Sequence, residues 1–257
     1  MKQNLQKNKV LFWLGSIHLL IFIVLFIYSF FNDVSILGIN SMIKPMKFAL
    51  SIWIYSWTMG LILNYVVDNR KVKVYSWVAV ICMGFEQIAI TFQALKGELS
   101  HFNKSDIFGM VLFALMGVFI LIITFWTIYI THIFIKQKIY ELKPPIVLSI
   151  KIGLIFFIIF SLFGGYISSS QGHTVGAIDG GQGLWFINWS THFGDLRVAH
   201  FFGIHSLQII PLFALVSYKY FDNSTSIIIV KSFSFIYLLF ILLTLGQGLL
   251  GFPFLKL

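Results

Sequence analysis

One carboxylate in this chain, Glu86, lies deep inside a long apolar segment, whereas the other acidic residues fall in or beside the breaks between such segments. A charged group at that depth in hydrocarbon costs roughly 2.5–3.5 kcal/mol, so it normally has a polar partner and marks a working site. His205 is a candidate partner, because the two side chains share one membrane depth. At about 1.5 Å per residue, Glu86 lies roughly 15 Å and His205 roughly 12 Å below the outer ends of their predicted spans. We predict that Glu86 and His205 face each other and form a catalytic centre. The alternative is a buried Glu–His hydrogen bond that only fixes helix packing.

Other histidines could turn this pair into a metal site. His101, His200, His205 and Glu86 together offer enough nitrogen and oxygen ligands for zinc or iron. Their spacing is not diagnostic, because His200 and His205 are five residues apart and point about 140° away from each other on a straight helix. A kink at Pro211 could bring them together. Otherwise each histidine bonds to a separate neighbour. Gln208 is such a neighbour of His205, because the two residues are three positions apart on one helix.

Further polar residues are predicted near the Glu86–His205 pair. Pro45 suits the first turn of a helix, which places Lys44 and Lys47 at its positive end, where an anionic group is attracted. The alternative is that each lysine snorkels to water. We expect contacts to substrate or to an anion from Lys44, Lys47, Gln93, Arg197 and Gln208.

The composition is that of a membrane protein. Hydrophobic residues make up 58% of the 257 residues, charged residues make up 11%, and Phe alone contributes 29. The net charge of +9 comes from short flanks between apolar runs, a pattern that fits membrane topology rather than nucleic-acid binding. The single cysteine, Cys82, excludes an intramolecular disulfide and is expected to be an inert buried thiol.

Seven apolar runs are long enough to cross hydrocarbon, which takes about 20 residues. We predict one all-α transmembrane domain covering residues 1–257, with short connections. The predicted spans are about 10–31, 46–67, 74–96, 106–135, 148–167, 197–218 and 227–251.

Basic residues predict the orientation of these spans. Twelve would lie on the side of the amino terminus: Lys2, Lys7, Lys9, Arg70, Lys71, Lys73, Lys136, Lys138, Lys143, Lys151, Lys219 and Lys231. Six would lie on the other side: Lys44, Lys47, Lys96, Lys104, Arg197 and Lys256. This bias favours a cytoplasmic amino terminus and an outside carboxyl terminus.

The outer loop 168–196 is long and contains six glycines, which indicates tight turns or positive φ angles. Trp185, Phe186 and Trp189 argue against disorder. We predict an ordered cap over the outer mouth of the bundle, formed with His173, Asp179, His192 and Asp195; a plain interfacial loop is the alternative. Asp195 and Arg197 are expected to orient this cap rather than do chemistry, through a hydrogen-bonded ion pair or through contacts to loop carbonyls. An exposed pair of this kind contributes about 0–1 kcal/mol.

Several blocks resemble a family of multi-pass bacterial membrane proteins without an established function: KPMKFALS, SHFN, GHTVGAIDGGQGL, NWS and GDLRVAHFFGIHSLQ. This resemblance covers most of the chain and implies architecture but no chemistry. Seven spans with an inside amino terminus also resemble the membrane hydrolases related to alkaline ceramidases and progestin-type receptors. Those proteins carry an HxxxH zinc pair in the last span, whereas this chain has HxxxxH in the sixth.

Three functions are compatible with these residues. The leading hypothesis is a metal-dependent or acid–base membrane enzyme that acts on a lipid-like substrate, because the polar residues gather in the outer half beneath the loop. A b-type haem protein with histidine axial ligands is an alternative. A proton-coupled transporter using Glu86 is another, although its polar groups should continue to the cytoplasmic face, where the sequence is largely apolar. No nucleic acid is expected as a partner.

Overall fold

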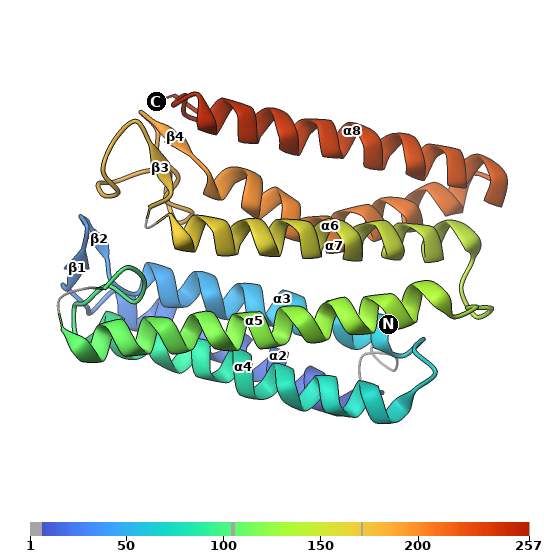
Figure 1. Cartoon of the computed structure of the whole chain (residues 1–257), viewed down its shortest axis with the longest axis horizontal. Helices are drawn as coiled ribbons and strands as arrows, with labels where there is room; N and C mark the ends of the chain where they lie inside the picture. Colours follow the sequence, from blue (N-terminus) through green and yellow to red (C-terminus); the bar gives the residue numbers. More distant parts are fainter. Residues whose placement is uncertain (1–6, 104–105, 171, 257) are drawn as a thin grey trace. The chain divides into compact units, whose positions relative to one another are not determined.

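A computed structural model of the chain describes residues 7–103, 106–170 and 172–256. These residues contain seven helices that are long and apolar enough to cross a membrane. They are α2 (Lys9–Ser29), α3 (Ile43–Leu63), α4 (Asn69–Leu95), α5 (Ile107–Lys136), α6 (Pro144–Ser169), α7 (Arg197–Tyr220) and α8 (Asn223–Leu249), shown in Figure 1. The chain is a multi-pass, all-α membrane protein. Each predicted span overlaps one helix, with boundaries that differ by up to five residues.

The chain forms two compact units. Unit 1 comprises Met1–Thr127 and Asp179–Asn188, and unit 2 comprises Ile128–Ile178 and Trp189–Leu257. The boundary therefore falls inside α5 and twice inside the long loop. The prediction of a single domain concerns how the units join, and it stays a prediction. Lys2 and Lys104, used for the orientation, and Gln171 of the long loop lie outside the described residues.

Capping residues define where several helices begin. The side chains of Asn8, Asp68 and Asp222 each accept a hydrogen bond from a backbone N–H in the first turn of α2, α4 and α8. α6 begins with Pro144 and Pro145, whose ring-fixed φ suits the first turn. These polar breaks interrupt the apolar runs and determine the span boundaries.

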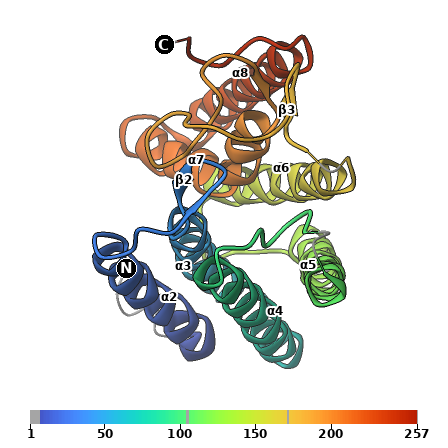
Figure 2. The same cartoon turned by 90° about the vertical axis from the view of Figure 1, so that its left-hand side faces the viewer.

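In unit 1, α3 packs against both α2 and α4 (Figure 2). One core cluster joins Leu25 of α2, Met42 at the N-cap of α3 and Met46 of α3 to Ala94 of α4. A second joins Ala89 and Ile90 of α4 to Met116 of α5. Aromatic rings extend this contact, since Phe85 of α4 stacks on Phe119 of α5 with ring centroids 4.4 Å apart.

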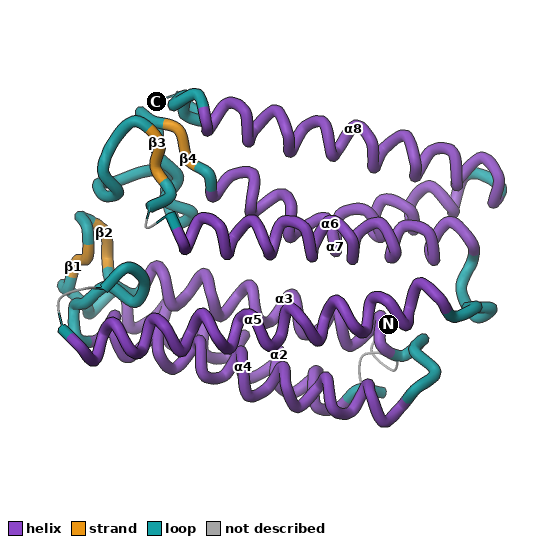
Figure 3. The backbone as a smooth tube through the Cα atoms, viewed as in Figure 1, coloured by secondary structure: helices purple, strands orange, loops and turns teal. Residues whose placement is uncertain are grey.

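Three loop segments gather where α2 and α4 end and α3 and α5 begin, and we call this the cap end of unit 1. The first contains the hairpin of β1 (Ser35–Ile36) and β2 (Ile39–Asn40), visible in Figure 3, whose turn needs the positive φ of Gly38. The second is loop 96–103, the described part of the connection between α4 and α5. The third is segment 179–188, which joins the hairpin through a bond from Gly181 N–H to the Leu37 carbonyl at 3.0 Å.

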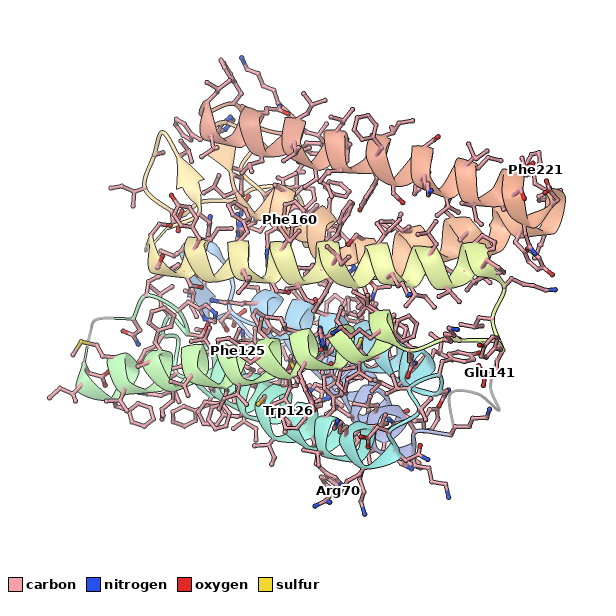
Figure 4. All side chains as sticks on the ribbon, turned by 45° about the vertical axis from the view of Figure 1, so that its right-hand side comes forward. Arg70, Phe125, Trp126, Glu141, Phe160 and Phe221 are labelled. Carbon is pink, nitrogen blue, oxygen red and sulfur yellow. The ribbon has the colours of Figure 1, made fainter. Side chains whose placement is uncertain are left out.

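In unit 2, α7 packs closely against α6 and α8. Phe160 projects from α6 (Figure 4) onto Gly203 of α7, where an added Cβ would lie 2.0 Å from the Phe160 ring. Pro211 lies inside α7, as predicted. The short strands β3 (Thr174–Val175) and β4 (Gly194–Asp195) pair antiparallel. Gly194 allows this pair to rest on α8, because a Cβ there would meet the Gly248 carbonyl.

Candidate functional site

Glu86 occupies the buried face of α4, and its side chain is the centre of the candidate site in unit 1. The residue is 1% exposed, and its Oε1 has no hydrogen-bond partner among residues 7–103, 106–170 and 172–256. Buried carboxylates are normally paired, because an unsatisfied charged or polar group in an apolar surrounding is costly. An unpaired oxygen at this depth therefore points to a ligand or to a proton on the carboxyl group.

Two glutamines of α4 present further unpaired oxygens. Gln87 donates from Nε2 to the Pro45 carbonyl at 3.3 Å and to the Thr91 hydroxyl at 3.0 Å, yet its Oε1 is buried without a partner in the described structure. Gln93 donates to the Leu99 carbonyl at 3.3 Å, and its Oε1 is likewise unpaired within the described chain. Glu86 and Gln93 are two helical turns apart on one face. This part of α4 thus offers acceptors suited to a ligand with N–H or O–H donors.

Lys44 supplies the positive charge of this region. It lies in the first turn of α3, and its ammonium group acts electrostatically on both Glu86 and His101. The sequence predicted an anion contact for Lys44. In unit 1 the Lys44 charge acts on the Glu86 carboxylate, and a contact of Lys44 with a bound anion stays a prediction.

His101 lies in loop 96–103 among aromatic rings. Its ring centroid is 6.0 Å from Phe48 and 5.5 Å from Phe113. Burial lowers the pKa of His101 well below its usual range, and the charge of Lys44 lowers it further, although a bond with Ser100 acts in the opposite direction. The imidazole is therefore neutral at pH 7, and its unprotonated ring nitrogen can accept a hydrogen bond.

The backbone at the cap end adopts costly conformations. Among the described residues, the non-glycine residues with positive φ are Leu37 (52°), Phe102 (59°), Phe186 (59°) and Asn188 (54°), and all of them belong to cap-end loops of unit 1. Such conformations cost on the order of 1–3 kcal/mol each in residues other than Gly and cluster at functional sites. Phe102 follows His101 directly, so this strain accompanies a candidate site residue.

Lys47 fastens segment 179–188 to α3. Its ammonium donates to the Ile187 carbonyl at 3.1 Å, between the strained residues Phe186 and Asn188. Phe186 also packs against the Leu25–Met46 core cluster. Asp179 begins this segment and is half-buried. Segment 179–188 of the Gly-rich loop therefore covers the cap end of unit 1, whereas a cap over the outer mouth of the whole bundle stays a prediction.

A half-open groove of about 230 Å³ lies beside that segment. Its walls are the end of α2, the start of α3, and Trp185 and Phe186. Ile43 and Met46 line it from the same turn of α3 that carries Lys44. The lining is mainly apolar and aromatic, which suits a hydrocarbon chain.

In unit 2, the histidines of α7 bond to separate neighbours. His200 Nδ1 lies 2.7 Å from the Phe160 carbonyl, and His205 Nδ1 lies 3.3 Å from Gln208 Oε1. The His205 ring also packs on Phe201, with centroids 4.4 Å apart. The alternative in which these histidines have separate partners is what the structure contains.

Asp195 and Arg197 form the predicted ion pair, but it is not exposed. Arg197 Nη2 lies 2.6 Å and Nε 2.9 Å from the carboxylate, which also accepts the Ser190 N–H at 2.9 Å. The Asp195 side chain is 0% exposed and that of Arg197 is 26% exposed, so the expected exposed pair is wrong. The cause is the contact of Gly194 with α8, which draws β4 inward. His173 Nδ1 lies 4.0 Å from Asp195, whereas His192 is exposed.

The predicted centre divides between the two units. Glu86 and His101 belong to unit 1, whereas His200 and His205 belong to unit 2, so the Glu86–His205 pair stays a prediction. Within the described residues, no group of three or more His, Cys, Asp or Glu side chains could hold one metal ion. The zinc or iron centre and the haem b alternative also stay predictions. Metal analysis and an absorption spectrum of the purified protein test both.

The structure contains one buried polar cluster that the sequence analysis missed. The hydroxyl groups of Tyr55, Tyr75 and Thr127 bond to one another in the core of unit 1. Tyrosine and threonine are common in membrane helices, so their types alone gave no signal. A usable signal was the helical spacing of Tyr75, Cys82 and Glu86, which share one face of α4.

Comparison of the chain with family models, curated proteins and solved structures gives no match. The geometry of the chain itself therefore carries the functional argument.

Proposed function

We propose that this chain is a membrane enzyme that carries out acid–base chemistry with Glu86 on an ester-linked amphiphile at the cap end of unit 1. The observation that carries the proposal is the buried, unpaired Glu86 oxygen, on which the charge of Lys44 acts. Positioned carboxyl groups of this kind contribute roughly 10²–10⁴-fold to proton-transfer steps.

The residues of unit 1 divide the chemical work. Glu86 takes a proton from a water molecule that attacks the ester carbonyl, and it returns that proton to the leaving alcohol, so an acid and an alcohol are released. Lys44 stabilises negative charge near Glu86. The acceptor oxygens of Gln87 and Gln93 orient hydroxyl or amine groups of the substrate. Neutral His101 offers a hydrogen-bond acceptor at the same end.

The apolar groove supports an amphiphilic substrate. It lies at the end of membrane-spanning helices, where Trp185 and Phe30 are strongly exposed, as is typical of interfacial aromatic residues. The Glu86 region and the groove both involve the first turn of α3. A lipid-like molecule with an acyl chain and a polar head satisfies both environments.

The orientation and the family resemblance belong to this proposal too. The excess of basic residues near the predicted cytoplasmic ends supports a cap end on the outer side of a bacterial plasma membrane. The sequence blocks quoted above support a relationship to multi-pass bacterial membrane proteins.

The test uses the full chain in vesicles of phosphatidylethanolamine and phosphatidylglycerol, with lysolipid and free fatty acid followed over time by mass spectrometry. We expect wild-type protein to release both products and Glu86→Gln to slow their release roughly 10²–10⁴-fold. Glu98→Gln is the matched control, because Glu98 lies at the same end but pairs with Lys96 at 2.8 Å. Absence of product with wild type, or equal rates for wild type and Glu86→Gln, would contradict the proposal.

A further inference from the structure

A hydroxyl cluster lies in the core of unit 1, toward the end opposite the cap. Thr127 Oγ1 of α5 lies 3.0 Å from the Tyr55 hydroxyl of α3 and 3.2 Å from the Tyr75 hydroxyl of α4. The two tyrosine hydroxyls also bond to each other. Tyr75 is 0% exposed and Thr127 is 1% exposed. Three helices thus bring three exchangeable O–H groups into one buried contact.

Cys82 connects this cluster with Glu86. Its thiol bonds to the Ile123 carbonyl, which also accepts the Thr127 hydroxyl at 2.8 Å. Glu86 and Cys82 are four residues apart, which is about 6 Å along one face of α4. One bridging water is enough to span such a gap.

Polar groups continue to the far end of α4. Ser76, 1% exposed, accepts a hydrogen bond at 2.9 Å from Asn8, the half-buried N-cap of α2. At the other extreme, Gln93 and His101 lie at the cap end. From Ser76 to Gln93 the rise along α4 is about 26 Å, close to the roughly 30 Å of a hydrocarbon core. Buried polar groups of α4 therefore extend over nearly the full membrane depth of unit 1, although Ser76 lies about 100° around the helix from Tyr75.

We propose that these buried polar groups form a proton path in unit 1. The path links the Asn8 end to Glu86 through Ser76, Tyr75, Tyr55, Thr127 and Cys82. Each hydroxyl or thiol accepts a proton as it releases its own to the next group, so O–H and S–H bonds form and break in equal numbers. No group is oxidised or reduced. Waters bridge the longer gaps, and the apolar surroundings exclude hydrated ions.

Proton exit from Glu86 is toward the cap end, where Lys44 of α3 and His101 are the titratable neighbours. Cys82 of α4 lies on the entry side of Glu86. The path rests on the proposed function only in taking Glu86 as a proton-exchanging group. It adds a transmembrane proton flow that ester hydrolysis does not require.

Proton flow is measured with the full chain in liposomes that contain a trapped pH-sensitive dye, while a potassium gradient with valinomycin sets the membrane potential. We expect wild-type protein to carry protons faster than protein-free liposomes do. Tyr75→Phe and Thr127→Val should lower this flow roughly tenfold or more, because each removes an exchangeable hydroxyl. Thr127→Ser keeps the hydroxyl and should retain the flow.

Tyr237→Phe is the matched control, because this substitution in unit 2 also removes a tyrosine hydroxyl that makes a hydrogen bond. In the wild-type chain the Tyr237 hydroxyl donates to the Phe202 carbonyl at 2.7 Å. It should leave proton flow within about twofold of wild type, since only packing is affected. Wild-type flow no faster than in protein-free liposomes would overturn the proposal. So would unchanged flow in both Tyr75→Phe and Thr127→Val.

The lipid assay separates this inference from the proposed enzyme. If Tyr75→Phe loses proton flow but still releases fatty acid, both proposals stand as independent activities. If Glu86→Gln still cleaves lipid while proton flow falls in the Tyr75 and Thr127 variants, the enzyme proposal fails at Glu86 and the path remains.

Discussion

The buried ion pair of Asp195 and Arg197 allows a quantitative prediction about unit 2. Asp195→Asn keeps the volume of the side chain, so no cavity forms. It removes the charge that accepts two guanidinium bonds, of 2.6 and 2.9 Å, and it turns an amide donor toward existing donors. Breaking a buried pair by removing one partner costs about 3–5 kcal/mol.

The two partners should respond unequally. After Asp195→Asn, the Arg197 side chain, 26% exposed, can still reach water, so we expect a loss of about 3 kcal/mol, at the low end of that range. After Arg197→Met, the Asp195 carboxylate, 0% exposed, remains charged without its partner, and the loss should be larger, about 4–5 kcal/mol. Removing both charges should recover part of the loss, because no unpaired charge remains.

The assay is thermal unfolding of the detergent-solubilised chain. About 2–4 °C of melting temperature per kcal/mol predicts a fall of roughly 6–12 °C for Asp195→Asn. The control is Asp222→Asn, which replaces an exposed N-cap with an equally good one and should leave the melting temperature unchanged. The reasoning from burial would be refuted if Asp195→Asn and Asp222→Asn had the same melting temperature. It would also be refuted if Arg197→Met lowered the melting temperature less than Asp195→Asn.

Acid should remove the same stabilisation. Burial raises the pKa of Asp195, but the hydrogen bonds and charge of Arg197 outweigh it and hold that pKa below its usual range. A depressed folded-state pKa stabilises the protein above the unfolded value of about 3.9, and the contribution is lost as the pH falls through the folded-state value. The difference in stability between wild type and Asp195→Asn should therefore be constant from about pH 5 to 8 and close below about pH 4.

Two further predictions concern packing and orientation. Gly203→Ala should destabilise unit 2 by about 1–3 kcal/mol, because the new methyl group meets the Phe160 ring, and Phe160→Ala in the same chain should make the Gly203 change nearly neutral; additive losses would contradict this. In a Cys82→Ser background, a cysteine at Ser169 should react with a membrane-impermeant thiol reagent from outside and one at Ser224 should not, and the reverse result would invert the orientation.

The helices could be predicted from the sequence because two kinds of signal mark their boundaries, the end of an apolar run and the polar residues that follow it. Long apolar runs indicate spans, and residues such as Asp68 and Asp222 at the breaks both interrupt hydrophobicity and cap the following helix. The errors of up to five residues arise where helices continue past the apolar run, as α4 does from Asn69 before the predicted start at 74. A capped polar turn is helical without being hydrophobic.

The candidate site was predictable only where one residue is unusual by itself. Glu86 is conspicuous because a carboxylate interrupts an apolar run. Tyr75 and Thr127 are ordinary in such runs, and only the packing of α3, α4 and α5 reveals that their hydroxyls meet. Their presence changes the argument about transport, because buried polar groups continue beyond Glu86 where the sequence seemed largely apolar. The burial of Asp195 was missed for a related reason, since it depends on the contact of Gly194 with α8.

The contrast between the two units supports the proposal that the function lies in unit 1. In unit 2 the buried charge of Asp195 accepts from Arg197 and Ser190, and His200 and His205 each have a partner. The unpaired buried side-chain atoms of unit 2 in the described residues are the hydroxyl oxygens of Thr131 and Ser217, which carry no charge. In unit 1 Glu86 and Gln93 keep unpaired buried oxygens, beside loops whose backbone is strained. Folding alone favours pairing such oxygens or replacing them with apolar groups. Their retention in the core of unit 1 is explained if a ligand or a moving proton completes their bonds during function.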